Sequence, residues 1–286
     1  MAYNKHMGFL FSLIAILGDS SGKTLDKLNF SKNRITFRQM MLVGFLGMGG
    51  SLLVFILLTK QPFPRLSLIS LGLVILVALV SFGNNIFDTL SLKADDLSLR
   101  EPMVDFEPIL AGLVGYALFP AERKPLFLVA FVLGALIVYW GTHRRKLRRL
   151  QKKGMMYMLL AALLYAFLPS IYKITLAYLS PAYIAFFRIA SILVLTNIFL
   201  PVKKVGAISR SKWTYGLLAG LIYAIEAIAS LYAIKSLGVV LTMVILMLGP
   251  ALRYWSSYFI LKEEVRMGEM VSSFMLTAVV LVAVVK

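Results

Sequence analysis

Apolar residues occur along this chain in long runs, separated by short connectors rich in charged residues and proline. A helix that crosses a membrane needs about 20 mostly apolar residues. Prolines such as Pro120, Pro181 and Pro201 lie at or near the ends of the runs, where a missing N–H costs little. We therefore predict an all-α integral membrane protein with ten transmembrane helices and no soluble domain. The predicted spans are residues 7–27, 35–58, 67–90, 99–119, 125–142, 155–178, 181–200, 213–234, 239–261 and 267–285.

Composition supports this class and excludes several kinds of chemistry. Of the 286 residues, 60% are hydrophobic and 15% are charged, against roughly 45–50% and 25% in soluble domains. The chain has no cysteine and two histidines, which excludes a disulfide framework, a cysteine nucleophile, a cysteine-linked lipid anchor and a histidine-rich metal cluster. We expect a multi-pass protein of the cell membrane, with no cofactor and no metal. The first apolar run lacks a small-residue cleavage pattern, so we expect it to remain as a helix.

The net charge of +17 does not by itself indicate nucleic-acid binding. The basic residues gather in short connectors between apolar runs, where they orient helices against anionic lipid. A protein that binds nucleic acid needs its positive charge on one accessible face. We therefore expect a lipid bilayer and a small-molecule substrate as partners, and no nucleic acid.

Residue patterns recur between the two halves of the chain. Three pairs of residues lie 150 positions apart and three more lie 142 positions apart. An odd number of helices per repeat makes the second copy cross the membrane in the opposite direction, a pattern typical of secondary transporters with a site between the repeats. We predict a first five-helix repeat at residues 1–142, a basic connector at 143–153 and a second repeat at 154–286. The pairs are Ser20 and Ser170, Lys23 and Lys173, Arg38 and Arg188, Lys93 and Lys235, Pro108 and Pro250, and Glu122 and Glu264.

The segment "LGDSSGKTL", residues 17–25, superficially suggests a phosphate-binding loop. Such a loop needs four residues between its first glycine and Gly-Lys, and it follows a strand. Only three residues separate Gly18 from Gly22, and the matching segment around Lys173 keeps the lysine without the glycines. The pattern therefore indicates a lysine inside a membrane helix.

Several longer segments resemble one family of transporters. They are "FRQMMLVGFLG", "SPAYIAFFRIASILVL", "EPILAGLVGYALFPAE", "GPALRYWSSYFILKEE" and "LYAIKSLGVVLTMVILMLGP". In order, spacing and duplication these segments resemble the two EamA repeats of the drug/metabolite transporter superfamily, over almost the whole chain and more strongly in its second half. The resemblance implies a ten-helix transporter that moves small metabolites by alternating access around a central cavity. The segment "NNIFDTLSLKADDLSLREPMVDFEP" departs from the family pattern because it is unusually acidic.

Charged residues within the predicted spans carry the functional argument, because a charge at the bilayer centre is costly and marks a pathway. In the first span, Asp19, Lys23 and Asp26 share one helix face. We expect a small polar substrate, zwitterionic or charged. The predicted substrate-binding residues are Lys23, Asn84, Asn85, Asp88, Asp105, Tyr172, Lys173, Tyr223, Glu226 and Arg253.

Two further roles are assigned from the same pattern. Glu226, Asp105 and Glu107 are candidates for coupling transport to protons, since a carboxylate taken out of water binds protons more readily. Pro108 and Pro250 are predicted helix kinks, because each removes a backbone donor and frees a carbonyl in the preceding turn.

Structural roles remain open beside these functional ones. The charges of the first span could form an ion pair that serves only stability, and Glu226 could permanently neutralise Arg253 or Lys173. Arg38 and Arg188 are expected near helix starts, where long basic side chains reach lipid headgroups. Glu122 and Glu264 are expected to fix the geometry of connectors.

An enzyme is the alternative function. The segment "NNIFDTLSLKADD" partly resembles the first aspartate-rich motif of UbiA-type prenyltransferases, which hold Mg²⁺ against a diphosphate. That chemistry needs a second acidic cluster, yet no aspartate follows Asp105. We therefore predict a transporter and no enzyme, and leave open the substrate, the direction of transport, the coupling ion and whether the protein is a monomer or homodimer.

Two arguments about orientation disagree. The family resemblance implies that both termini lie in the cytoplasm. The connectors at 144–153 and 203–212 nevertheless hold more basic residues than the loops at 60–65 and 123–124 on the other side. Because cytoplasmic loops carry the excess of lysine and arginine, charge favours termini outside.

Overall fold

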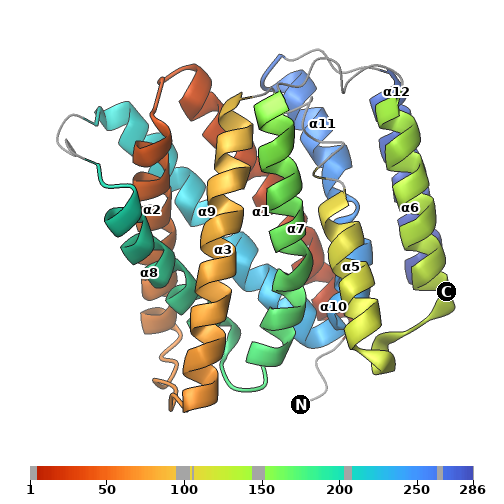
Figure 1. The fold of residues 1–286 in the computed structure, drawn as a ribbon, viewed down its shortest axis with the longest axis horizontal. Helices are drawn as coiled ribbons and strands as arrows, with labels where there is room; N and C mark the ends of the chain where they lie inside the picture. Colours follow the sequence, from red (N-terminus) through yellow and green to blue (C-terminus); the bar gives the residue numbers. More distant parts are fainter. Residues whose placement is uncertain are drawn as a thin grey trace.

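The computed structural model is built from helices that lie roughly side by side, and it describes residues 5–94, 104, 106–143, 152–202, 208–262 and 267–285. Figure 1 shows these helices running up and down the molecule, with α1 beginning and α12 ending in its lower part. The elements are α1 (Lys5–Ser31), α2 (Phe37–Leu58), α3 (Leu68–Ala94), α5 (Phe106–Leu118), η1 (Pro120–Glu122), α6 (Pro125–His143), α7 (Lys152–Thr175), α8 (Pro181–Phe199), α9 (Arg210–Leu237), α10 (Val239–Leu246), α11 (Gly249–Phe259) and α12 (Met267–Val285).

Helix length and apolar character identify an integral membrane protein that crosses the bilayer several times. Within the described ranges, six helical segments are long and apolar enough to span a membrane, and three shorter helices are also apolar. The six are Phe37–Leu58, Leu68–Ala94, Lys153–Thr175, Pro181–Phe199, Arg210–Leu237 and Val239–Phe259. Many large apolar side chains are exposed on the outside of the bundle, for example Leu58 at 77% and Leu68 at 86%. Such a surface suits a lipid environment.

Local sequence explains where several helices begin and end. Thr36 caps α2 in a capping box with Gln39, whose backbone N–H donates to the Thr36 hydroxyl over 3.3 Å. Pro181 opens α8, where its missing N–H leaves no bond unmade. Gly238 separates α9 from α10 with φ of +83°, a conformation that glycine adopts without strain.

Prolines within the predicted spans have different effects. The span predicted at 239–261 is broken into α10 and α11 by a turn at Met247 and Leu248, directly before Pro250. Pro108 lies in the first turn of α5, where proline is tolerated, and residues 95–103 and 105 lie outside the described part. Pro169 lies inside α7, a position that the sequence analysis did not single out.

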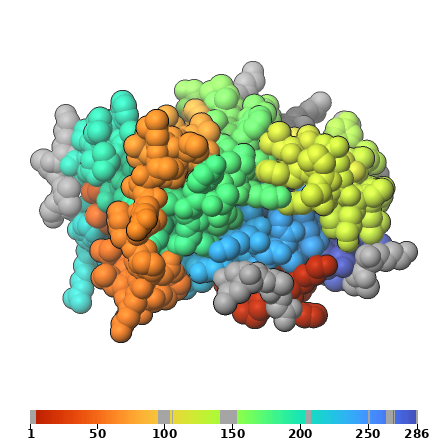
Figure 2. Space-filling view, turned by 90° about the horizontal axis from the view of Figure 1, so that it is seen from below, coloured from red at the N-terminus to blue at the C-terminus, as the bar shows by residue number. Residues whose placement is uncertain are grey.

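The helices pack in pairs that join the two halves of the chain. α1 packs along α9, α3 along α7, α2 against α8, α5 against α10 and α6 against α12. Figure 2 views the bundle from below and shows α7, in green, in contact with orange α3 and with the blue segment around α10. The largest fully buried side chains include Phe131, Leu52 and Ile189, which belong to one continuous apolar core.

Candidate functional site

A cavity of about 200 Å³ lies in the middle of the bundle. Nine helices from both halves of the chain supply its walls: α1, α2, α3, α5, α7, α8, α9, α10 and α11. Many of the side chains that line it are polar or charged although they belong to apolar helices. These polar residues are Asp19, Lys23, Asp26, Ser81, Asn84, Asn85, Asp88, Thr89, Glu107, Tyr165, Tyr172, Arg188, Tyr223, Glu226, Ser230 and Arg253.

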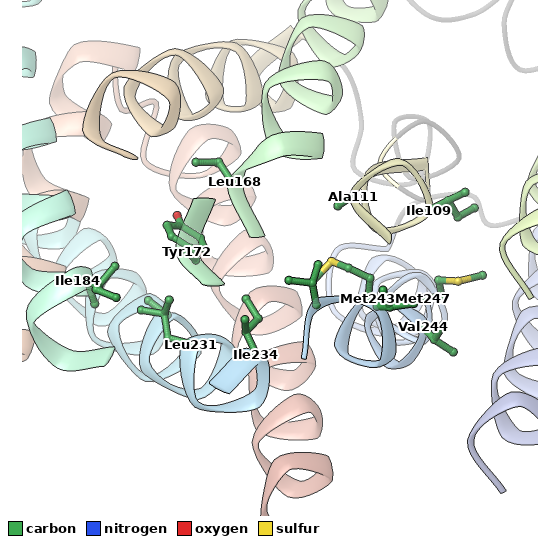
Figure 3. Close-up of a cluster of buried hydrophobic side chains, with 14 of the residues drawn as sticks. Ile109, Ala111, Leu168, Tyr172, Ile184, Leu231, Ile234, Met243, Val244 and Met247 are labelled. Carbon is green, nitrogen blue, oxygen red and sulfur yellow. The ribbon is translucent and has the colours of Figure 1, made fainter. Parts of the chain in front are cut away.

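Apolar side chains also line the cavity. Figure 3 draws side chains of the buried apolar core, among them Leu168 and Tyr172 of α7, Leu231 and Ile234 of α9 and Met243 of α10. All five line the cavity, and Met243 is 1% exposed. The cavity therefore has a polar wall, formed by the polar residues named above, together with apolar lining residues.

The cavity brings together most of the predicted substrate-binding residues. Eight of the ten line it: Lys23, Asn84, Asn85, Asp88, Tyr172, Tyr223, Glu226 and Arg253. Glu107 and Pro108 line it as well. Lys173 does not line it, Asp105 lies outside the described residues, and the side chain of Pro250 is likewise outside them.

The charges of α1 belong to a network with three other helices. Lys23 lies 3.4 Å from Asp88 of α3 and 3.8 Å from Asp19, one turn before it. Asp19 also pairs with Arg253 of α11. Tyr223 of α9 donates a hydrogen bond to Asp26 over 2.9 Å. The side chains of Lys23 and Arg253 are only 9% and 7% exposed, so pairing compensates for taking both charges out of water.

Glycines allow α1 to carry this network close to α9. A Cβ on Gly18 would lie 2.8 Å from the Cβ of Glu226, and one on Gly22 would lie 2.5 Å from the ring of Tyr223. Both distances are too short for real atoms, so only glycine allows this approach. The glycines of the "LGDSSGKTL" segment therefore serve helix packing, and the segment is helical throughout, as predicted.

Arg188 lies in the cavity, and the sequence analysis was wrong to expect it at the lipid headgroups. It lies about two turns into α8, which starts at Pro181. Its Nη1 donates a hydrogen bond to the Tyr172 hydroxyl over 2.6 Å, and that hydroxyl lies 3.4 Å from the Ser81 hydroxyl. The Nε of Arg188 is buried and makes no hydrogen bond within the described structure. Arg38, its predicted counterpart, lies in the first turn of α2 and is exposed.

Glu226 occupies the same cavity without an ion pair to any described residue. Ser230, one turn further along α9, is its hydrogen-bond partner, and Arg188 and Lys23 act on it electrostatically. The two bases that the sequence analysis considered as its permanent partners are engaged elsewhere, since Arg253 pairs with Asp19 and Lys173 pairs with Glu122.

Comparison with known proteins identifies the second half of the chain. Residues 152–285 match the EamA-like transporter family. The second half belongs to the EamA family. This confirms, for the second half of the chain, the resemblance to drug/metabolite transporters found in the sequence.

The whole chain also has a known fold. A solved structure described as "Crystal structure of protein" superposes with a TM-score of 0.76 at 15% identity, over 97% of this chain and 96% of that one. It is one of 28 chains of solved structures that match. At this identity the likeness concerns the fold alone. No curated protein matches the sequence.

The EamA half contributes a polar contact outside the cavity. Lys173, at the end of α7, pairs with Glu122 of η1 and lies 3.9 Å above the ring of Phe119. The other carboxylate oxygen of Glu122 accepts a hydrogen bond from the backbone N–H of Val240 over 2.9 Å. Glu122 thus holds the start of α10 and the end of α7 together, in the connector where the sequence placed it.

Amides of α3 add fixed dipoles to the polar wall. Asn84 donates a hydrogen bond to the backbone oxygen of Ala161 over 2.9 Å, and Asn85 donates to that of Ser81 over 2.7 Å. These bonds hold the two amides in place and leave their side-chain oxygens as acceptors.

In the part of the chain described, no group of three or more histidine, cysteine, aspartate or glutamate side chains is placed to hold a metal ion. Asp88, the first acid of the motif that resembles prenyltransferases, faces Lys23, and the other two lie outside the described residues.

Some cavity residues were not predicted from the sequence, among them Arg188, Tyr165 and Pro169. The position of Arg188 about two turns after the start of its helix could have indicated that it lies inside the membrane, because two turns carry a side chain well past the lipid headgroups. Tyr165 lies in an otherwise apolar stretch of α7, where an aromatic ring gives no signal that separates packing from lining.

Proposed function

We propose that this protein is a secondary active transporter that moves a small polar metabolite, zwitterionic or charged, across the cell membrane by alternating access. The observation that carries the proposal is the cavity, which collects charged side chains from both halves of the chain among membrane-spanning helices. Ion pairs needed only for stability could form between packed helices without an open space beside them. Here the charges surround a volume of about 200 Å³.

The proposed architecture is two inverted five-helix repeats that form ten membrane spans. Helix packing supports it, because contacts occur in matched pairs when α1, α2 and α3 are taken as counterparts of α7, α8 and α9. The contact of α1 with α9 matches that of α7 with α3, and the contact of α2 with α9 matches that of α8 with α3. The supposed counterparts α1 and α7 run in opposite directions in Figure 1. Such pseudosymmetry is typical of secondary transporters, in which one repeat rocks against the other and so changes the side on which the cavity opens.

Cavity size favours a small solute. A volume of about 200 Å³ is below the roughly 300–1,000 Å³ of sites for drug-sized ligands. Both the polar wall and the small volume argue against a lipid as the solute.

Proton coupling is part of the proposal. Glu226 and Glu107 line the cavity, and Asp105, the third candidate, lies outside the described residues. A carboxylate that faces the solute can exchange a proton for it, so that the proton gradient drives net movement.

Exchange across a sealed membrane tests the function. The purified protein is reconstituted into proteoliposomes that contain an unlabelled solute, and the same solute in labelled form is added outside. The solutes tested are amino acids, amines, nucleosides and nucleotide sugars. We expect one class to accumulate transiently above protein-free liposomes, with accumulation reduced by Glu226→Gln and unchanged by Arg38→Gln. Folded protein that exchanges no class, or that consumes an isoprenoid diphosphate with Mg²⁺, would contradict the proposal.

A further inference from the structure

Arg188 is the one basic side chain of the cavity wall, within the described residues, that forms no salt bridge. Lys23 faces two carboxylates and Arg253 faces Asp19. Arg188 instead donates to a neutral hydroxyl, that of Tyr172, and its buried Nε has no acceptor in the described structure. A buried guanidinium with unused donors is expensive to maintain.

Tyr172 fixes the direction of the guanidinium. Its hydroxyl accepts from Nη1 over 2.6 Å, and the guanidinium carbon lies 5.8 Å from the centre of its ring. This contact holds Nη1 of the guanidinium, whereas Nε has no hydrogen-bond partner among the described residues. Two parallel N–H groups of arginine match the two oxygens of a carboxylate.

Glu226 supplies the opposite charge in the same space. It also lacks a salt bridge among the described residues, and Arg188 acts on it electrostatically without ion-pair contact. A base and an acid that share a cavity but remain apart provide two charged positions for a ligand between them.

The net charge of the cavity lining favours some negatively charged groups over others as ligands of Arg188. Among the described residues, five carboxyl side chains and three basic side chains line the cavity. A phosphate, with a second negative charge, would face this acidic surplus, whereas a carboxylate next to an ammonium group adds no net charge. The lining therefore favours a carboxylate that belongs to a zwitterion.

We propose that Arg188, held by Tyr172, is the subsite that binds the carboxylate of the transported solute, and that Glu226 binds its ammonium group. The proposal rests on the proposed function, because it names the chemical groups that this transporter recognises. It makes Arg188 a determinant of specificity, a role that its sequence counterpart Arg38 does not share.

Binding in detergent tests the subsite without requiring transport. The twenty standard L-amino acids are screened by thermal shift on the intact protein, and the tightest binder is compared by titration with its methyl ester, which lacks the carboxylate, and its N-acetyl form, which lacks the ammonium group. We expect each derivative to bind wild-type protein at least about tenfold more weakly than the parent, since each leaves one buried charge unpaired. Equal binding of the ester and the parent by the wild type would overturn the proposal even if no variant folds.

Variants assign each group to its residue. Arg188→Gln is expected to weaken binding of the parent amino acid at least about tenfold and to leave the affinity for the methyl ester unchanged, so that the variant binds the two with similar affinity. Glu226→Gln is expected to weaken binding of the parent amino acid and to leave the affinity for its N-acetyl form unchanged, so that the variant no longer prefers the parent. Arg188→Lys keeps the charge and is expected to retain part of the preference for the parent over the ester. Arg38→Gln is the matched control and is expected to leave all ratios unchanged.

The outcomes separate this proposal from the proposed function. A preference for the parent over the ester that survives Arg188→Gln would place the carboxylate elsewhere and overturn the subsite, while the transporter stands. Exchange of a solute that lacks a carboxylate, or tighter binding of inorganic phosphate than of any amino acid, would also overturn the subsite alone. Absence of all solute exchange would overturn the function.

Discussion

Arg253 of α11 donates a hydrogen bond to Asp19 of α1, although 234 positions separate the two residues. This contact joins the first helix of the chain to the second half of the broken segment α10–α11. Asp19 lies at the same time 3.8 Å from Lys23. One carboxylate therefore links two basic side chains on the cavity wall.

Removing either member of the Asp19 and Arg253 pair is expected to destabilise the protein. Arg253→Gln and Asp19→Asn each leave a charge of the network without its closest partner, and because Asp19 is 29% exposed the cost is expected to be about 1–3 kcal/mol rather than the full cost of a buried pair. Thermal melting in detergent measures it.

A double-mutant cycle supplies the control for this pair. The double variant is expected to lose less stability than the sum of the losses in the two single variants, because the contact can be lost only once. Strictly additive effects would show that the pair does not couple.

Gly18→Ala is expected to lower stability by about 1–3 kcal/mol, because its new Cβ would lie 2.8 Å from the Cβ of Glu226 and push α1 away from α9. Gly72→Ala is the matched control, since nothing lies within 4 Å of a Cβ at that position. Its melting temperature is expected to be unchanged or slightly raised by the better helix propensity of alanine. If both variants melted alike, close packing at Gly18 would not matter.

Glu122→Gln is expected to loosen the contact between η1, α7 and α10. The variant loses the charge that faces Lys173, whose side chain is 31% exposed, but keeps an acceptor for the N–H of Val240. We expect a loss of about 1–2 kcal/mol in thermal melts. Lys173→Gln is expected to cost a similar amount and to leave the affinity for the solute unchanged, because Lys173 does not line the cavity. A large loss of affinity in Lys173→Gln would contradict this assignment.

The pH dependence of transport is expected to change when cavity carboxylates are replaced. If Glu226 or Glu107 carries the coupled proton, Glu226→Gln or Glu107→Gln will flatten the pH profile of uptake and abolish accumulation driven by a pH gradient. Exchange of labelled for unlabelled solute in the Glu107 variant should persist, since exchange needs no net proton movement. Unchanged profiles in both variants would exclude both residues as proton carriers.

The all-helical, membrane-spanning character of the chain could be predicted from the sequence because long apolar runs have few alternatives to helices inside a bilayer. Charges such as Lys23 and Asp88 could also be assigned to the cavity, since the cost of burying them in lipid forces them toward protein or water. These predictions rest on single residues and their immediate surroundings.

Pairing between distant residues could not be predicted in the same way. The sequence predicts Lys23 and Lys173 as counterparts, yet Lys23 faces Asp88 in the cavity and Lys173 faces Glu122 outside it. Arg38 and Arg188 differ likewise, because α2 begins at Phe37 whereas α8 begins seven residues before Arg188. The constant offset between the two halves of the sequence predicts which positions correspond. The partner of each residue depends instead on which helix packs against it.

The most direct test asks whether one position in the cavity can be reached from both sides of the membrane. The chain contains no cysteine, so Asn85→Cys introduces a single thiol at the cavity wall, and Gly72→Cys introduces one on the exposed face of α3 as the control. Inside-out and right-side-out vesicles are treated with a membrane-impermeant thiol reagent, with and without the solute that exchanges. We predict that Asn85→Cys is labelled in both kinds of vesicle and more slowly when the solute is bound, while Gly72→Cys stays unlabelled. Labelling of Asn85→Cys from one side only, under every condition, would contradict alternating access through this cavity.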